Sequence, residues 1–118
     1  MSKIRDYLLD IQRAIERIQI YVNMDKENFY KDIKTQDAVI RNFEIIGEAV
    51  KRLPQELTEK YTTIPWTDIA KFRDFLIHHY AKIDLDEIWM SYEKDIPPLS
   101  KTIEMMIMDL DLNQGDSL

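Results

Sequence analysis

The sequence contains no cysteine and only two glycines and four prolines among its 118 residues. Without cysteine, the chain forms neither disulfides nor thiolate metal sites. The scarcity of glycine and proline disfavours a turn-rich β fold and favours helices. No apolar run approaches the roughly 20 residues that a membrane span requires, and the first residues show no signal-peptide pattern. We therefore expect a soluble, cytoplasmic protein built from helices.

An excess of basic residues is also missing. Lys and Arg together number 16 against 22 Asp and Glu, which gives a formal net charge of −6. Proteins that bind nucleic acids usually carry a basic footprint, so this balance counts against broad, non-specific nucleic-acid binding. The balance is compatible with a small basic cleft, because the local potential governs binding at a site.

The spacing of apolar residues predicts a single all-α domain, an up-down helical bundle of four long helices and a few short ones. The first helix carries an amphipathic stripe from Ile4 to Val22, in steps of three and four residues. Asp25 and Asp84 stand where they can cap short helices, the second with Glu87 as a capping box. The predicted long helices cover residues 2–23, 36–53, 67 to between 80 and 83, and 98–110; the domain covers residues 1–112, and residues 113–118 form a flexible tail.

Three residues of the second long helix stand out. Gly47 lies mid-helix, where glycine costs about 1 kcal/mol relative to alanine, so it predicts a close approach by another backbone or side chain. Glu44 and Glu48 are i,i+4 neighbours that repel each other unless a cation lies between them. A solvated acidic edge and a role in orienting a basic partner account for this pair equally well.

The methionines of the last helix favour a homodimer. Met105, Met106 and Met108 provide more apolar surface than one narrow helical stripe buries. In so small a domain this surplus suggests that two copies pair through a helix face. A monomeric core that absorbs the same residues is the alternative.

The third long helix carries the best candidate for chemistry, at residues 71–80. Both histidines, His78 and His79, lie there, with Arg73 before them and Tyr80 after them. On a helix, Arg73 and Tyr80 fall two turns apart on nearly one line. Asp74 and His78 are i,i+4 neighbours, so we expect the carboxylate to accept a hydrogen bond from the imidazole and fix its tautomer. Arg73 and His78 lie about 140° apart around the axis. If they act on one ligand, the arginine must reach around, the helix must distort, or a two-fold-related chain must bring a second copy alongside.

An arginine and a histidine without a Ser or Cys nucleophile suit phosphodiester cleavage in RNA. Arginine presents a fixed charged fork to phosphate oxygens, and histidine moves a proton near neutral pH. The 2′-hydroxyl of RNA is itself the nucleophile, so the protein supplies proton transfer and charge stabilisation. A surface salt bridge or a hydrogen-bonded structural histidine explains the same spacing, and spacing alone favours that explanation. A metal site is weaker still, because only Asp74 and His78 have ligand-like spacing.

The segment from Arg73 to Tyr80 resembles the Arg-x4-His-x-Tyr motif of the HepT-like toxins in the HEPN superfamily. Several matching segments in the right order are far more specific than the short motif alone, and the likeness covers most of the chain. The other matching segments are Arg-Asn-Phe-Glu-Ile-Ile-Gly-Glu-Ala at 41–49, Ile-Pro-Trp at 64–66, Ile-Asp at 83–84 and Ile-Trp at 88–89.

The resemblance implies a HEPN-like homodimer in which two motifs face a shared cleft, and a metal-independent endoribonuclease toxin. By position, Arg73 and His78 are the implied catalytic pair. Asp74 and His79, where the group often has Asn and Gly, are implied supporting residues. The implied partners are RNA and a cognate MntA-like nucleotidyltransferase antitoxin that transfers AMP from ATP to Tyr80 and so silences the toxin. ATP is then used by the antitoxin, and this chain needs no cofactor.

Two other interpretations of the sequence stay open. The chain could be a non-catalytic helical module that binds a nucleotide or a nucleotidyltransferase and presents Tyr80, which the net charge of −6 modestly favours. It could also be an architectural helical dimer without a ligand. In that case substitution of Arg73, His78 and Tyr80 would alter stability alone.

Overall fold

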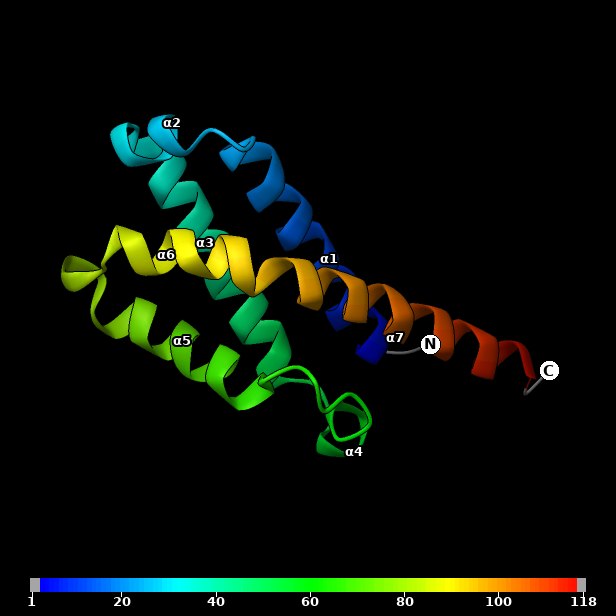
Figure 1. Cartoon of the computed structure of the whole chain (residues 1–118). Helices are drawn as coiled ribbons and strands as arrows, with labels where there is room; N and C mark the ends of the chain where they lie inside the picture. The colour runs from blue at the N-terminus through cyan, green and yellow to red at the C-terminus, as the bar shows by residue number, and fades with distance from the viewer. Residues whose placement is uncertain (1–2, 117–118) are drawn as a thin grey trace.

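The computed structural model describes residues 3–116, and the regular elements within them are all helices, joined by short loops (Figure 1). Ser2, the predicted first residue of the first helix, lies outside this range. None of the helices within it is long and apolar enough to cross a membrane. The elements are α1 (Lys3–Val22), α2 (Lys26–Lys31), α3 (Ile33–Lys51), α4 (Gln55–Thr58), α5 (Trp66–His78), the 3₁₀ helix η1 (Tyr80–Lys82), α6 (Leu85–Lys94) and α7 (Ile96–Asp116).

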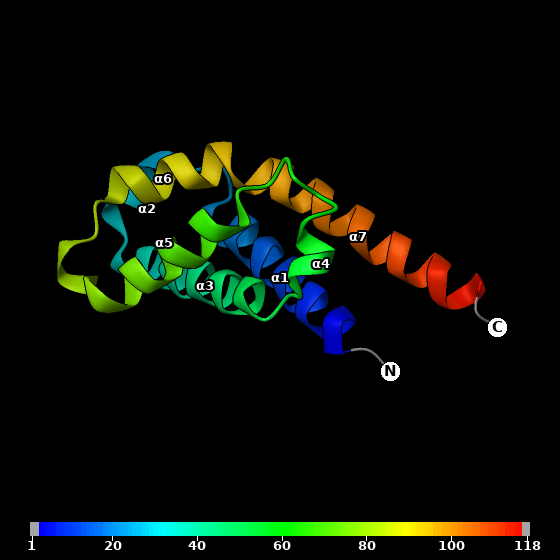
Figure 2. The ribbon, with the colours of Figure 1, turned by 90° about the horizontal axis from the view of Figure 1, so that it is seen from below.

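Helix α3 packs against both α1 and α5. Helix α1 also packs along α7. Helices α6 and α7 follow one another along one edge, and α7 extends past the rest of the bundle (Figures 1 and 2). The predicted stripe of α1 forms much of the core, because its members from Leu8 to Val22 are at most 2% exposed. The predicted helical bundle is confirmed.

Two predicted helix starts are displaced. Helix α3 begins at Ile33 and not at Gln36, because the Asp32 carbonyl already accepts the Gln36 N–H and the Asp32 carboxylate accepts the Thr35 hydroxyl. Helix α7 begins at Ile96, before the predicted Pro98, since prolines are tolerated in a first turn whose N–H groups have no intrahelical partner.

Both predicted capping aspartates accept a backbone N–H in the first turn of the helix that follows them. Asp25 accepts the Asn28 N–H at 3.0 Å, as expected of a cap. Asp84 accepts the Asp86 N–H at 2.9 Å, one residue earlier than a capping box predicts. Helix α7 continues through Asp116, so residues 113–116 are helical, and residues 117–118 lie outside the described range. The flexibility predicted for residues 113–118 stays a prediction.

The methionines of α7 divide between core and surface. Met106 is 1% exposed and belongs to the core, whereas Met105 and Met108 are 48% and 63% exposed. Leu112, one turn further along, is 62% exposed. The monomer core therefore absorbs one methionine of the three, and an apolar stripe remains on the outer side of α7.

Candidate functional site

Helix α5 holds most of the predicted motif against α3. Its first residue is anchored to the preceding loop, because the Trp66 indole Nε1 donates to the Tyr61 backbone oxygen at 3.0 Å. Leu76 is fully buried, and Phe72 meets Phe43 of α3 edge to face with ring centroids 5.7 Å apart. These apolar contacts fix the rotation of α5, so the motif side chains take defined directions.

Arg73 lies directly on Gly47 of α3. A Cβ added to Gly47 would lie 2.1 Å from the Arg73 Cβ and 2.8 Å from its Cγ. The predicted close approach at this glycine is therefore confirmed, and the approaching group is the stem of the candidate catalytic arginine. The Arg73 side chain is 23% exposed, and its Nη2 lies 2.9 Å from Glu48 while its Nη1 lies 2.9 Å from Asp74. Gly47 thus leaves room for the stem of Arg73, and the carboxylates of Glu48 and Asp74 hold its guanidinium in place.

A pocket of about 200 Å³ opens beside Arg73, between α1, α3 and α5. Arg41 and Arg52 also line it, so three arginines share one pocket. Arg41 lies 3.6 Å from Glu44, and Arg52 lies 3.0 Å from Glu48. Because Glu48 pairs with both Arg52 and Arg73, it orients basic partners, which was one of the two explanations offered for the glutamate pair. The pocket combines the basic groups that an anion requires with acidic groups that balance them.

The predicted bond between the Asp74 carboxylate and His78 is wrong. The Asp74 Oδ1 accepts from Arg73 Nη1 at 2.9 Å and from Lys51 Nζ of α3 at 3.2 Å. The Arg73 hydrogen bond, followed by that of Lys51, holds the pKa of Asp74 below its ordinary value. The Asp74 carboxylate therefore turns toward α3, because two cationic side chains, Arg73 and Lys51, bind it there. A hydrogen bond from the imidazole of His78 would stabilise the carboxylate less than these two full charges do.

His78 forms a hydrogen bond with the backbone of Asp74 and not with its carboxylate. Its Nδ1 lies 2.8 Å from the Asp74 carbonyl oxygen. A carbonyl oxygen only accepts, so Nδ1 carries a proton and donates it, which leaves Nε2 of the neutral ring as a proton acceptor. The side chain is exposed at the end of α5. This tautomer suits a general base, although its support comes from a backbone carbonyl and not from the expected carboxylate.

His79 and Tyr80 lie beyond the end of α5. The ring of His79 stacks near Phe75 with centroids 5.0 Å apart. Tyr80 begins η1, so the expected line from Arg73 to Tyr80 along one helix is wrong, because the α-helix stops at His78. The Tyr80 hydroxyl donates to Asp37 Oδ1 of α3 at 2.7 Å. That hydrogen bond, with the charge of Asp37, raises the pKa of Tyr80 above its ordinary value.

The structure therefore brings together only part of the predicted set. Arg73 and Asp74 are joined directly, whereas over residues 3–116 no hydrogen bond or ion pair links Arg73 to His78 or Tyr80. Sequence reasoning missed Lys51 and Asp37, which lie 23 and 43 residues away from their motif partners. No local pattern marks either residue, since both are surface charges of an amphipathic helix.

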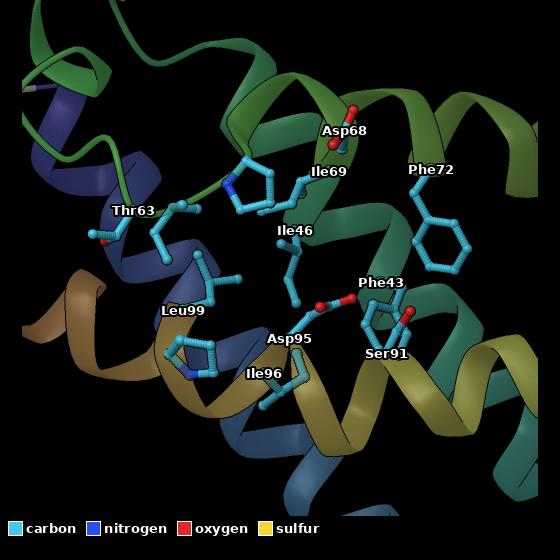
Figure 3. Close-up of a pocket in the computed structure, with 13 residues that line it drawn as sticks. Phe43, Ile46, Thr63, Asp68, Ile69, Phe72, Ser91, Asp95, Ile96 and Leu99 are labelled. Carbon is cyan, nitrogen blue, oxygen red and sulfur yellow. The ribbon is translucent and has the colours of Figure 1, made fainter.

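A second, more apolar pocket lies elsewhere. Its volume is about 280 Å³, and it opens between α5 on one side and the junction of α6 with α7 on the other (Figure 3). Ile69 and Phe72 of α5 face Ile96 and Leu99 across it. None of the motif residues from Arg73 to Tyr80 lines this pocket. Within the described range no group of three or more His, Asp or Glu side chains forms a candidate metal centre.

The sequence matches a family of ribonucleases. Residues 11–106 fit the model of the family described as "Ribonuclease HepT-like". The chain is 43% identical over 103 residues to a protein of Thermococcus cleftensis named "Probable ribonuclease HepT", which is 86% of this chain and 94% of that protein. No solved structure matches the chain.

Two proteins of Methanocaldococcus jannaschii are also similar. One, MJ0127, is named as a candidate RNase and is 41% identical over 116 residues, 98% of this chain and 96% of that protein. The other, MJ0434, is named as a gamma-glutamylcyclotransferase and candidate RNase, and is 42% identical over 114 residues. The match covers 96% of this chain but spans about half of MJ0434, 51% of its length. Because the family model covers most of the sequence, the chain belongs to the HepT-like ribonuclease family.

Proposed function

We propose that this chain is an endoribonuclease toxin that cleaves RNA with Arg73 and His78 and requires no bound metal ion. The family description agrees with the enzyme class that the motif predicts. The observation that carries the proposal is the fixed tautomer of His78, whose Nδ1 bonds to a carbonyl and whose Nε2 is left as a base on an exposed side chain. A half-buried arginine in a pocket with two other arginines supplies the positive charge.

The chemistry follows from these two groups. His78 Nε2 accepts the proton of a 2′-hydroxyl, whose oxygen attacks the adjacent phosphorus and expels the 5′-oxygen, which takes up a proton as it leaves. Arg73 faces the negative charge that develops on the phosphate oxygens. Glu48 and Asp74 hold the guanidinium before substrate arrives, so little reorganisation is needed.

A homodimer would complete such a site. Arg73 and His78 point about 140° apart on one helix, so one copy does not direct both at the same phosphate. Phe75 and Ile77 lie between them in sequence and are 39% and 43% exposed. Exposed apolar side chains on the motif helix suit contact with a second copy, which would bring its own motif to the cleft.

The proposed control of this activity is AMP transfer to Tyr80 by an MntA-like nucleotidyltransferase antitoxin in the cytoplasm. The Tyr80 side chain is 57% exposed, so a partner enzyme can reach its hydroxyl. The reaction uses ATP bound by the antitoxin, and this chain serves as the acceptor. An added phosphate ester at the end of the motif helix would repel the RNA backbone.

Cleavage of an end-labelled RNA by the purified protein tests the proposal. We expect the Arg73→Ala and His78→Ala variants each to lose about 100-fold or more in rate. Arg13→Ala is the matched control, because Arg13 is an exposed arginine on α1 whose ion pair is with Asp10. Wild-type activity should survive chelation of divalent metals. Equal cleavage by wild type and both motif variants would remove the catalytic assignment.

One observation favours the non-catalytic module instead. Both terminal nitrogens of Arg73 are already paired with carboxylates, and its Nε is buried without a hydrogen-bond partner in the described part of the chain. A guanidinium so occupied could serve only to brace α5 against α3. Under that alternative the wild-type protein accepts AMP on Tyr80 but cleaves no RNA, so the same preparation separates the two functions.

A further inference from the structure

The hydroxyl of Tyr80 donates a hydrogen bond to the carboxylate of Asp37 on α3. The Oη to Oδ1 distance is 2.7 Å, and Asp37 is exposed in the second turn of α3. The contact joins η1 to a helix 43 residues earlier in the chain. A hydrogen bond of this length to a charged acceptor fixes where the phenolic proton points.

AMP transfer to a tyrosine must dispose of that proton. As Tyr80 Oη bonds to the α-phosphorus of ATP, the bond from this phosphorus to the bridging oxygen breaks and pyrophosphate leaves with the electron pair. The hydroxyl proton must pass to a base, because a neutral phenol is a weak nucleophile. The raised pKa of Tyr80 keeps the phenol protonated near neutral pH, which increases the need for an acceptor.

We propose that Asp37 is the catalytic base for the modification of Tyr80, accepting the hydroxyl proton on Oδ1 as the phosphate ester forms. The protein that is modified would thus supply part of the machinery of its own modification. This inference rests on the proposed function, because it presupposes AMP transfer to Tyr80. After transfer, the proton passes from Asp37 to water and the ester oxygen has no proton left to donate.

The surroundings of Tyr80 leave Asp37 in the best position for this role. From α3, Glu44 also acts electrostatically on the Tyr80 hydroxyl, but the hydrogen bond is made by Asp37. His79, the residue before Tyr80 in the sequence, directs its ring toward Phe75. Lys82 lies in the same 3₁₀ turn and, as a cation, does not accept a proton.

The structure offers a close control pair. Tyr61 donates to Asp109 at 2.7 Å, the same distance as Tyr80 to Asp37, in a different part of the molecule. Asp37→Asn and Asp109→Asn therefore remove equivalent carboxylates and change the net charge equally. An asparagine oxygen still accepts the tyrosine hydrogen bond but does not take the proton, so Asp37→Asn preserves the position of the ring.

The experiment measures AMP incorporation into the full chain by intact mass. The chain is incubated with ATP and the proposed MntA-like nucleotidyltransferase antitoxin. We expect Asp37→Asn to slow incorporation about 100-fold or more and Asp109→Asn to match wild type. Asp37→Glu, which keeps a carboxylate, should recover part of the rate. Circular dichroism of each variant establishes that its fold is intact.

The pH profile separates a base from a residue that only positions the ring. With Asp37 as the base, the wild-type rate should be flat from about pH 6 to 9, whereas the Asp37→Asn rate should rise about tenfold per pH unit because it requires phenolate. Equal rates and profiles for wild type and Asp37→Asn would overturn the role of Asp37 while leaving the modification intact. Absence of AMP on the wild-type chain would overturn the proposed modification, and the role of Asp37 with it.

Discussion

Gly47 of α3 and Arg73 of α5 pack so closely that a single added methyl carbon would lie 2.1 Å from the Arg73 Cβ. The contact links a residue that is costly within a helix to the arginine on which the proposed chemistry depends. It also brings the guanidinium within 2.9 Å of Glu48, the residue after the glycine. Two adjacent positions of α3 therefore set the distance to α5, through Gly47, and the direction of the arginine, through Glu48.

Gly47→Ala should destabilise the protein. In an isolated helix the change would stabilise by about 1 kcal/mol, but overlap with a Cβ fixed to the α5 backbone should cost about 1–3 kcal/mol and reverse the sign. Denaturant unfolding measures the difference. In an Arg73→Gly background the overlapping Cβ is absent, so the same alanine should become less harmful. A stabilising effect in the wild-type background would contradict the close packing.

Asp74 should contribute to stability in a pH-dependent way. Its pKa is held below the ordinary value by Arg73 and Lys51, so the native state favours the ionised form. The contribution is fully present above the ordinary carboxyl pKa of about 3.9 and is lost as the pH falls through the lower native pKa.

Thermal unfolding of wild type and Asp74→Asn at a series of pH values tests this sign. We expect the wild type to be the more stable near neutral pH and the difference in melting temperature to shrink below about pH 4. Glu16→Gln, which removes an exposed carboxylate of α1, provides the comparison. A difference that grows in acid would mean that Asp74 is not stabilised by its cationic partners.

Loss of the Tyr80 hydroxyl should loosen η1. Tyr80→Phe removes the hydrogen bond to Asp37, which ties this short turn to α3. We expect faster amide hydrogen exchange over residues 80–82 and no incorporation of AMP. Tyr61→Phe, which breaks the equivalent bond to Asp109, should affect neither. Unchanged exchange in Tyr80→Phe would show that the turn is held by other contacts.

The homodimer proposal distinguishes two exposed apolar faces. If the motifs share a cleft, Ile77→Lys on α5 should yield a monomer, because a charge there is unfavourable in an apolar contact. Met108→Lys on the outer stripe of α7 should leave the dimer intact. Light scattering after size-exclusion chromatography measures the mass. The reverse outcome would place the contact on α7, and a monomeric wild type would exclude a stable dimer.

The elements of the fold could be predicted because their signals are local. The stripe from Leu8 to Val22 repeats with the period of a helix, and Asp25 caps the next helix with its own side chain. The cost of a mid-helix glycine likewise marked a close contact at Gly47 without showing what lies against it. Errors fell at the ends of elements, where Ile33 and Ile96 begin helices earlier than the apolar pattern does.

The site was less predictable, because Arg73, Asp74 and Tyr80 each have a charged partner on α3 that is distant in the sequence. Asp74 was expected to bind His78 one turn away, yet Lys51 and Arg73 offer it full positive charges. Tyr80 was expected to follow the line of Arg73, but the helix ends at His78 and the hydroxyl meets Asp37.

The sequence by itself determined a helical bundle with one cluster of titratable groups on its third long helix. Periodicity and composition depend on neighbouring residues and are therefore present in the chain before it folds. Only the tertiary structure decided which residues of α3 contact the motif. Gly47 accommodates the stem of Arg73 and Glu48 pairs with its guanidinium. Lys51 binds the carboxylate of Asp74, and Asp37 accepts the hydrogen bond of Tyr80. Those relations depend on how two helices are rotated and spaced, which is set by the packing of Phe43, Gly47, Phe72 and Leu76.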